Sequence, residues 1–408
     1  MVRATLYLVL LISLAHSLVH VFELSLPSVE QQIASEYFGA DEVSGKAMTG
    51  RLSNVWRLMW GFGAIVAGLL VDRFGARRLL AIYLLGCAAA CALAATSSTQ
   101  NSLFIAMIAM GAFASIYHPA GLSLISHETT ADNRPQALGL HGIFGSAGIS
   151  SAPLLAGVLL AASFTWRQIY WVLVVPGAIL GLVFVWQAVR QPIVESRRKS
   201  SGESDAPTSH KDEQDHVDWT SFFTLTAMAA VQGFIYSALM SFLPRYLSDA
   251  AESFGSAKGD GNFLAAGVLF AGCAGQAVAG RFAKSSILER QLAWITFGNI
   301  PFLAWMAFAG TWDRVPAAGL LALVHFMHQP IYNSLIAKYT PRHRRSLCYG
   351  FSFAMGLGLG SFGALFAGEF QSDGFVYGTL AGVAGLGCLI CTVLCMLNPS
   401  SDAVASSK

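Results

Sequence analysis

The chain has 408 residues, of which 54% are hydrophobic and only 12% are charged. That charged share is about half of what soluble proteins carry. A mean hydropathy of +0.55 and 40 glycines point the same way. The composition excludes a disordered chain and argues against a large soluble enzyme, and a net charge of +2 gives no indication of nucleic-acid binding. The sequence therefore predicts an all-α membrane protein that crosses the bilayer many times.

Twelve stretches are long and apolar enough to cross a bilayer, which takes about 20 residues of helix. They are residues 4–27, 52–71, 79–96, 102–125, 137–162, 169–189, 219–243, 262–280, 291–309, 316–337, 346–368 and 375–397. Cytoplasmic loops are enriched in Lys and Arg. With the N-terminus inside, 18 of the 25 Lys and Arg lie on the cytoplasmic side, six lie outside, and Arg57 lies within a span. We therefore expect a multi-pass protein of the inner (cytoplasmic) membrane, surrounded by lipid, monomeric, with both termini in the cytoplasm.

The first two spans contain ionisable residues, which are costly within a bilayer and are therefore candidates for function. Glu23 is the one acidic residue clearly inside a predicted span, and Arg57 lies at a comparable depth in the next span. We expect the two to pair, so that the arginine lowers the proton affinity of the carboxylate until substrate or closure separates them. A carboxylate that simply lies in an outer vestibule is the alternative.

Two histidines share a helix face with this carboxylate. His16 and His20 precede Glu23 by seven and three residues, spacings that place all three side chains on one side of the first span. Histidine titrates near neutral pH and also binds metals. Three interpretations stay open: buried histidines that only satisfy hydrogen bonds, a proton or substrate role, and, as the weakest, a divalent-metal site. No cofactor and no resident metal are expected, and protons are the expected coupling ion.

The loop between the second and third spans reads GLLVDRFGARR, residues 68–78. Gly68 would permit the close approach of a neighbouring helix, and Gly75 suits a tight turn. Asp72 ends the second span, where it can meet helix N-termini or arginines. The alternative is that the basic residues of this loop only set the topology. They are Arg73, Arg77 and Arg78.

The fourth and fifth spans combine polar residues with prolines and glycines. Tyr117 and His118 precede a proline in the fourth span, and His141 lies near the start of the fifth. Small residues spaced along the fifth span would allow tight packing against a facing helix, and its proline can kink it. The marked positions of the fifth span are Gly139, Gly148, Pro153 and Gly157.

A polar segment at 190–218 divides the chain after six spans. It has charges of both signs, many serines and no apolar period, which is typical of a flexible linker. We expect an N-terminal six-helix bundle at 1–189, a cytoplasmic linker at 190–218 and a C-terminal six-helix bundle at 219–408.

The second half supplies further polar residues within its spans. Together with Arg57 they are predicted to line a cavity between the halves. They are Gln232 and Tyr236 in the seventh span, and His325, His328, Gln329 and Asn333 in the tenth.

The two halves also show an internal repeat. YHPAGLSLI at 117–125 aligns with HQPIYNSLI at 328–336, an offset of 211 residues. The same offset pairs Pro119 with Pro330 and, in the following span, Gly145 with Gly356. One offset held over two helices and a loop indicates two copies of one unit. Two copies in the same orientation imply a pseudo-twofold axis along the membrane normal, with a site between the halves.

The motifs and the repeat together resemble the major facilitator superfamily over essentially the whole chain. The loop at 68–78 matches the superfamily's GxxxDRxGxRR. The resemblance implies twelve helices in two pseudo-symmetric bundles, with Asp72, Arg73 and Arg77 latching the cytoplasmic gate in the outward-open state. In the second half Gly280 stands at the acidic position, so the latch is expected on one side only.

A narrower resemblance concerns the fifth span. Proton-coupled exporters of the superfamily carry G-x8-G-x3-G-P-x2-G-G there, a motif associated with antiport. This chain keeps the spacing, with alanine at two of the glycine positions. YHPAGLSLIS and the first span AHSLVHVFELSLP are also similar to the fosmidomycin-resistance branch.

From these features we expect a secondary transporter that works by alternating access and exports a small organic solute or drug in exchange for protons. Arg57 and six histidines against one carboxylate favour an anionic or zwitterionic solute. The alternatives on the same fold are an importer of a nutrient or organic anion, a carrier of a divalent metal or metal chelate, and a sensor that does not transport. An enzyme is not expected, because the chain has no GxxxxGK[ST] loop, no HExxH and no soluble domain.

Overall fold

The computed structural model describes residues 3–130, 133–190, 216–253, 260–341 and 344–399. These residues are helical nearly throughout and include no strand. Most of the predicted linker at 190–218 lies outside the described residues, so the division of the chain there stays a prediction.

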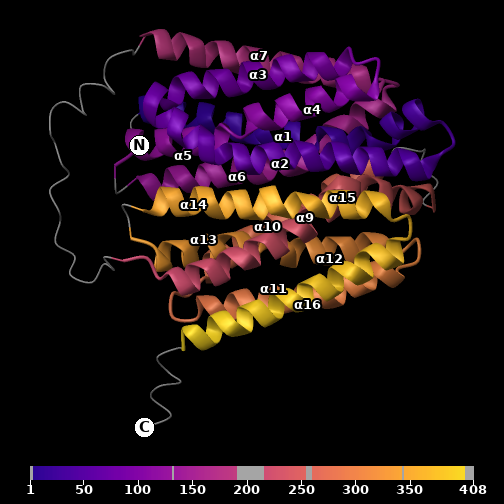
Figure 1. Ribbon diagram of the computed structural model, residues 1–408. Coiled ribbons are helices and arrows are strands. Elements are labelled where there is room, and N and C mark those ends of the chain that lie inside the picture. Colours follow the sequence, from indigo (N-terminus) through magenta and orange to yellow (C-terminus); the bar gives the residue numbers. More distant parts are fainter. Residues whose placement is uncertain (1–2, 131–132, 191–215, 254–259, 342–343, 400–408) are drawn as a thin grey trace.

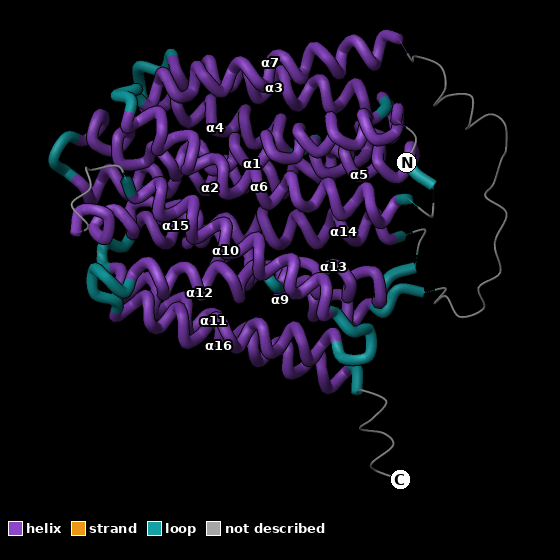
Figure 2. Tube along the Cα trace, turned by 180° about the vertical axis from the view of Figure 1, so that it is seen from behind, coloured by secondary structure: helices purple, strands orange, loops and turns teal. Residues whose placement is uncertain are grey.

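The helices form two groups that lie side by side in both views (Figures 1 and 2). The first bundle consists of α1 (Arg3–Phe38), α2 (Glu42–Phe74), α3 (Ala76–Ala95), α4 (Gln100–Ala114), α5 (Tyr117–Glu128), α6 (Arg134–Ala161) and α7 (Trp166–Arg190). The second bundle consists of α9 (Trp219–Ser253), α10 (Gly261–Phe282), α11 (Leu288–Phe308), α12 (Arg314–Phe326), α13 (His328–Tyr339), α14 (Arg345–Phe353), η1 (Ala354–Gly358), η2 (Leu359–Ser361), α15 (Phe362–Glu369) and α16 (Asp373–Leu397).

The predicted all-α membrane fold is confirmed. Ten helical segments of the described chain are long and apolar enough to cross a membrane, among them 100–128 and 347–369, which each join consecutive helices. The remaining two predicted spans, 291–309 and 316–337, correspond to α11 and to the pair α12 and α13. The chain is therefore consistent with twelve spans.

The fourth and tenth spans are both broken, and at equivalent positions. Helix α5 begins at Tyr117 and α13 begins at His328, which are 211 residues apart as in the sequence repeat. Pro119 and Pro330 are the third residues of these helices, and proline has no N–H with which to continue the helical hydrogen bonds of the preceding segment. The repeat is thus visible in the backbone. The break before α5 places Tyr117 and His118 within the first bundle, whereas Gln329 after the equivalent break is exposed.

Three helices are longer than predicted. Helix α1 runs to Phe38 and α9 to Ser253, each through an internal proline, and α2 already begins at Glu42. Their predicted ends at 27 and 243 were wrong because a proline removes one hydrogen bond without ending a helix that is packed on its neighbours. Asp41 caps α2 by accepting from Ser44, and these hydrogen bonds hold the pKa of Asp41 below its usual range.

Helix α1 begins and α16 ends on the same side of the molecule (Figure 1), which we call the terminal side. The opposite side, where α1 ends and α2 begins, is the distal side. The bundles meet where α1 packs on α9, α2 on α15 and η1, and α6 on α10. Helices α5 and α13, which end on the terminal side, pack against helices of their own bundles.

Candidate functional site

Glu23 lies at the interface between the bundles and is almost fully buried. Its Oε2 atom is 2.9 Å from Nδ1 of His20, one turn back in α1. Its Oε1 atom accepts a hydrogen bond of 3.0 Å from the hydroxyl of Tyr236, in α9 of the second bundle. One buried carboxylate therefore joins the first bundle to the second.

Arg57 lies beside this carboxylate, as predicted. Its Nε is 3.5 Å from Oε1 of Glu23, an ion pair longer than an ordinary hydrogen bond. Its Nη1 donates to Oγ of Ser241 in α9 at 3.0 Å, so the arginine also reaches across the interface. The Nε and Nη2 atoms have no hydrogen-bond acceptor among the described residues, although the side chain is only 1% exposed.

Four histidines of the first bundle lie close together, and one of them, His20, contacts Glu23. The ring of His16 stacks on that of His141 at 4.1 Å between centres and lies 5.1 Å from His20 and 5.3 Å from His118. Nitrogen atoms of His16, His20 and His118 all lie within 4.8 Å of one another, close enough to share a cation. The sequence suggested His16, His20 and Glu23 as a weak candidate metal site. In the structure the third member of the cluster is His118, whereas Glu23 contacts His20.

Tyr117 binds the backbone instead of facing a cavity. Its hydroxyl donates to the carbonyl of Ile12 at 3.0 Å and lies 3.4 Å from Nδ1 of His141. The break between α4 and α5 turns Tyr117 towards α1 and leaves His118 against the aromatic rings of Trp60 and Phe353. Trp60, which the sequence analysis did not single out, therefore links the histidines to the second bundle.

Besides Tyr236, the second bundle contributes two further predicted residues to this neighbourhood. The ring of His325 is parallel to that of Tyr236 at 6.4 Å, and its Nδ1 lies 3.0 Å from Oδ1 of Asn299. Gln232 lies one turn from Tyr236 in α9, buried, and neither polar atom of its side chain has a partner in the described part of the chain.

The other predicted residues of the tenth span lie elsewhere. His328 stacks on Tyr332 within its own helix. Gln329 is exposed and accepts from Gln276 of α10 at 2.5 Å, and Asn333 is exposed as well. The structure does not bring these three to Glu23.

A second buried carboxylate escaped the sequence analysis. Glu30 is 2% exposed and accepts two hydrogen bonds from Arg245 of α9, from Nε at 2.8 Å and from Nη2 at 3.1 Å. Thr49 of α2 donates to it as well, at 2.8 Å. The predicted first span ends at Pro27, so Glu30 lies outside it. The apolar period continues to Ile33, and this pattern could have indicated that the helix includes Glu30. Glu289 is also buried, so Glu23 is not the sole buried carboxylate.

Further contacts close the distal side between the bundles. Lys46 donates to the carbonyl of Phe370 at 2.8 Å, and Arg51 pairs with Glu369 at 2.8 Å. Gly50 lies directly against the backbone of Gly368, where a Cβ atom would approach within 2.8 Å. These contacts join α2 to the end of α15, so the bundles are held together on this side.

The loop at 68–78 lies on the terminal side, and most of its charged side chains are exposed. Gly75 has a φ of +86°, which confirms the tight turn. Arg77 pairs with Glu128 of its own bundle at 2.5 Å. Asp72 is exposed and forms no ion pair among the described side chains, and the basic neighbours Arg73 and Arg78 are also exposed. Nothing lies within 4 Å of where a Cβ atom of Gly68 would be, so no neighbouring helix approaches it closely here, and its role in the latched state stays a prediction.

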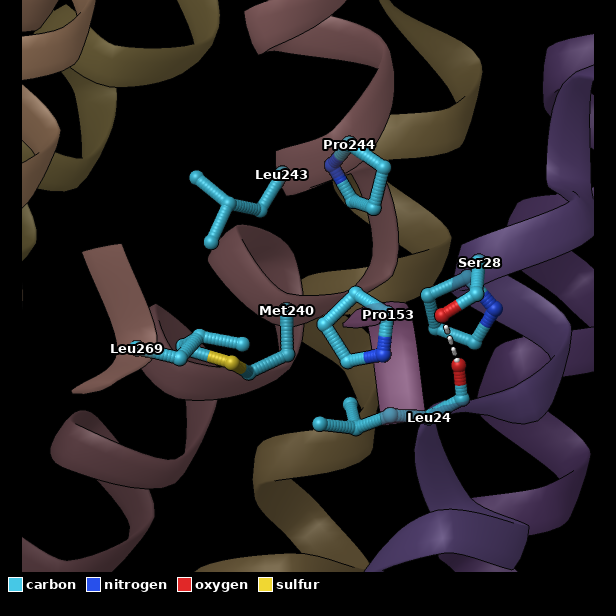
Figure 3. A pocket seen from close by; sticks show the side chains of 8 residues that line it. Leu24, Ser28, Pro153, Met240, Leu243, Pro244 and Leu269 are labelled. Atoms are coloured by element: carbon cyan, nitrogen blue, oxygen red, sulfur yellow. Dashed lines mark hydrogen bonds between the residues drawn. The ribbon is translucent and has the colours of Figure 1, made fainter. Parts of the chain in front are cut away.

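Helix α6 carries the spaced small residues of the fifth span. A Cβ atom on Gly148 would lie 2.4 Å from the carbonyl oxygen of Ser17 in α1, and one on Gly157 would lie 3.2 Å from Asn262 in α10. Gly139 faces open space. Pro153 lies in a small apolar pocket with Pro244 and Met240 of the second bundle (Figure 3). Two of the four positions therefore form the close helix packing that the sequence predicts.

Comparison with known proteins gives one family. Residues 21–365 match the Major Facilitator Superfamily. Over 166 residues the chain is 31% identical to the puromycin resistance protein pur8 of Streptomyces alboniger, covering 40% of this chain and 30% of that protein. Over 169 residues it is 31% identical to the uncharacterized MFS-type transporter Rv1250 of Mycobacterium tuberculosis, covering 40% and 28%. The chain thus aligns with less than a third of the length of these relatives.

Solved structures share the fold, and two of them serve as examples. Both are of a bacterial homolog to the human lysosomal transporter Spinster in an inward-facing conformation, one unoccupied and one occupied. The TM-scores are 0.66 and 0.67 at 16% and 15% identity. The alignments cover 97% and 95% of this chain, and 92% and 94% of the other.

Proposed function

The chain belongs to the Major Facilitator Superfamily and is a multi-pass membrane transporter, not an enzyme, and we propose that it exports a small organic solute in exchange for protons. Export is supported by the small-residue spacing of α6 and by the likeness to a puromycin resistance protein. The similarity of the first, fourth and fifth spans to the fosmidomycin-resistance branch points the same way.

The observation that carries the proposal is the position of Glu23. A carboxylate buried within a membrane bundle is costly and is by default a functional group. This one is bound by His20 of the first bundle and by Tyr236 of the second, next to a loosely paired Arg57. Protonation removes the charge that Arg57 and Tyr236 recognise, and therefore weakens a contact between the two bundles. Proton binding at Glu23 is in this way coupled to their separation.

The contacts between the bundles on the distal and terminal sides suggest how the transport cycle proceeds. The distal side is joined by Glu30 with Arg245 and by Lys46 with Phe370, while Asp72 on the terminal side is free of ion pairs in the described chain. From the distribution of Lys and Arg, we assign the terminal side to the cytoplasmic face of the inner membrane. The structure is then closed to the outside. When the bundles rock, the distal contacts break and Asp72, Arg73 and Arg77 latch the cytoplasmic side.

Everted membrane vesicles from expressing cells test the proposal. Puromycin is the probe, because one relative is a puromycin resistance protein. With an acidic vesicle interior, the wild-type protein should accumulate puromycin, and Glu23→Gln should abolish accumulation. Glu36→Gln is the matched control, since Glu36 lies in the same helix but pairs with Arg167 at the distal end. Equal accumulation by Glu23→Gln and wild type rejects the role of Glu23.

A second candidate function, transport of a divalent metal, is favoured by the three clustered imidazoles. A metal about 2.1 Å from Nε2 lies about 3.2 Å from the ring centre, so two rings that share it are at most about 6.4 Å apart. The ring pairs of His16, His20 and His118 lie 5.1, 5.3 and 6.2 Å apart. Nδ1 of His16 faces a backbone carbonyl and Nδ1 of His20 faces Glu23, which leaves both Nε2 atoms available.

Zinc uptake by the same vesicles decides between the two functions. A metal carrier accumulates zinc, and His118→Ala abolishes the accumulation. His127→Ala is the control, because His127 lies in the same helix α5 but is exposed and faces the carbonyl of Ser123. Puromycin accumulation without zinc accumulation supports the first function and excludes the second.

A further inference from the structure

We infer that the transported solute carries both a cationic group and an anionic or strongly accepting group, and that it binds by inserting between Glu23 and Arg57. The inference rests on the proposed function, because it names the class of solute for that site. It starts from buried polar atoms that have no partner in the described chain.

Arg57 supplies the first of these atoms. The guanidinium uses one nitrogen for Ser241, while its Nε and Nη2 donate to no acceptor among the residues that the structure describes. Buried polar groups in native proteins are nearly always hydrogen-bonded, so each exception needs an explanation. The distance of 3.5 Å to Glu23 shows that the two charges face each other without a hydrogen bond. An acceptor group of a ligand would satisfy both free N–H groups at once, because the guanidinium fork matches a carboxylate or phosphate.

Two further unpartnered groups lie one helical turn towards the terminal side. Trp60 follows Arg57 by three residues in α2, and its buried Nε1 has no acceptor in the described part of the chain. Gln232 precedes Tyr236 by four residues in α9, and neither its amide oxygen nor its amide nitrogen has a partner among the described residues. Helices α2 and α9 run in opposite directions between the two sides, so both residues flank the Glu23 contact on the same side of it. The ring of Trp60 packs edge-on against Phe353 at 5.5 Å and provides an apolar wall.

The charges select the class of solute. A solute with only an anionic group would draw Arg57 away from Glu23 and favour protonation of the carboxylate, so that solute and proton would bind together. A solute with only a cationic group would face the buried positive charge of Arg57. A solute with both groups satisfies Glu23 with its cation and Arg57 with its acceptor. Its cation then competes with the proton for Glu23, as exchange requires.

Binding to the purified protein tests this with two matched sets of probes. The first is L-phenylalanine, phenethylamine and 3-phenylpropionate, and the second is L-leucine, isoamylamine and 4-methylpentanoate. Binding is read from tryptophan fluorescence and from the midpoint of thermal unfolding. We expect the compound with both charges to bind most tightly in at least one set. A hydrogen bond between charged groups contributes about 1.5–3 kcal/mol, so each variant below should weaken the affected probes about tenfold or more.

The variants separate the two ends of the solute. Glu23→Gln should weaken the amine and the zwitterion but not the acid, and Arg57→Gln should weaken the acid and the zwitterion but not the amine. Arg57→Lys keeps the charge and should recover part of the loss, which also controls for folding. Glu36→Gln should change none of the six probes.

Two results overturn the inference. One is an acid that binds as tightly as its zwitterion, and the other is the absence of binding by both zwitterions. If puromycin accumulation still requires Glu23 in either case, the proposed function stands and only the solute class is wrong. If accumulation is independent of Glu23, the proposed function fails as well.

Discussion

The carboxylate of Glu30 in α1 is held by both Nε and Nη2 of Arg245 in α9, seven residues further along α1 than the contact between Glu23 and Tyr236. The same two helices are therefore joined twice by a buried carboxylate. The central contact involves a neutral hydroxyl and a loosely placed arginine, whereas the distal contact is a bidentate ion pair. This difference suits a proton-binding site in the centre and a gate at the distal end.

Removal of the distal ion pair should open the distal side. Glu30→Gln leaves Arg245 partly buried and without its main partner, and breaking a buried ion pair in this way costs about 3–5 kcal/mol. Thr49→Cys, whose side chain is buried beside Glu30, reports the opening through labelling by a membrane-impermeant maleimide. Labelling should rise in Glu30→Gln and stay low in Glu36→Gln. Equal labelling in all three backgrounds would show that the ion pair is not a gate.

At Gly61 the backbones of the two bundles lie so close together that a side chain should not fit. A Cβ atom there would lie 2.2 Å from the backbone nitrogen of Gly358, so Gly61→Val should destabilise this state by about 1–3 kcal/mol. Gly68→Val in the same helix is the control, since nothing lies within 4 Å of that position. Thermal unfolding of the purified variants measures the effect. A midpoint for Gly61→Val that matches Gly68→Val contradicts the packing of α2 on η1.

The spans were predictable from the sequence, because helix length and hydropathy are properties of each segment alone. The neighbourhood of Glu23 and Arg57 was predictable too, since two consecutive antiparallel helices bring equal depths together. The place of His118 beside His16 and His20 was not, because it depends on how the break before Pro119 turns the chain.

Tertiary packing also explains why Glu30 was missed and why Gly68 makes no close contact here. Pro27 reads as a helix end, yet α1 continues because its far turns are packed against α2 and α9. Gly68 fits a motif for close helix approach, but in this state nothing lies within 4 Å of where its Cβ atom would be. A single sequence specifies the motif and not the state of the cycle in which it is used.

Loss of the terminal-side latch should lower the rate of transport without changing the stability of the conformation described here. Asp72→Asn should lower puromycin accumulation about tenfold, since hydrogen bonds to a charged group contribute about 1.5–3 kcal/mol where they form. Its unfolding midpoint should equal that of the wild type, because Asp72 is exposed and makes no ion pair among the described side chains. Unchanged accumulation in Asp72→Asn would remove this residue from the gate.

The central claim is that a proton carried by Glu23 moves against the solute, and proton efflux from acid-loaded everted vesicles measures this most directly. A fluorescent pH indicator inside the vesicles follows the gradient after puromycin is added outside. Puromycin should dissipate the gradient in vesicles with the wild-type protein and with Glu36→Gln, but not with Glu23→Gln. Dissipation of the same size with Glu23→Gln, or none with the wild type, would contradict it.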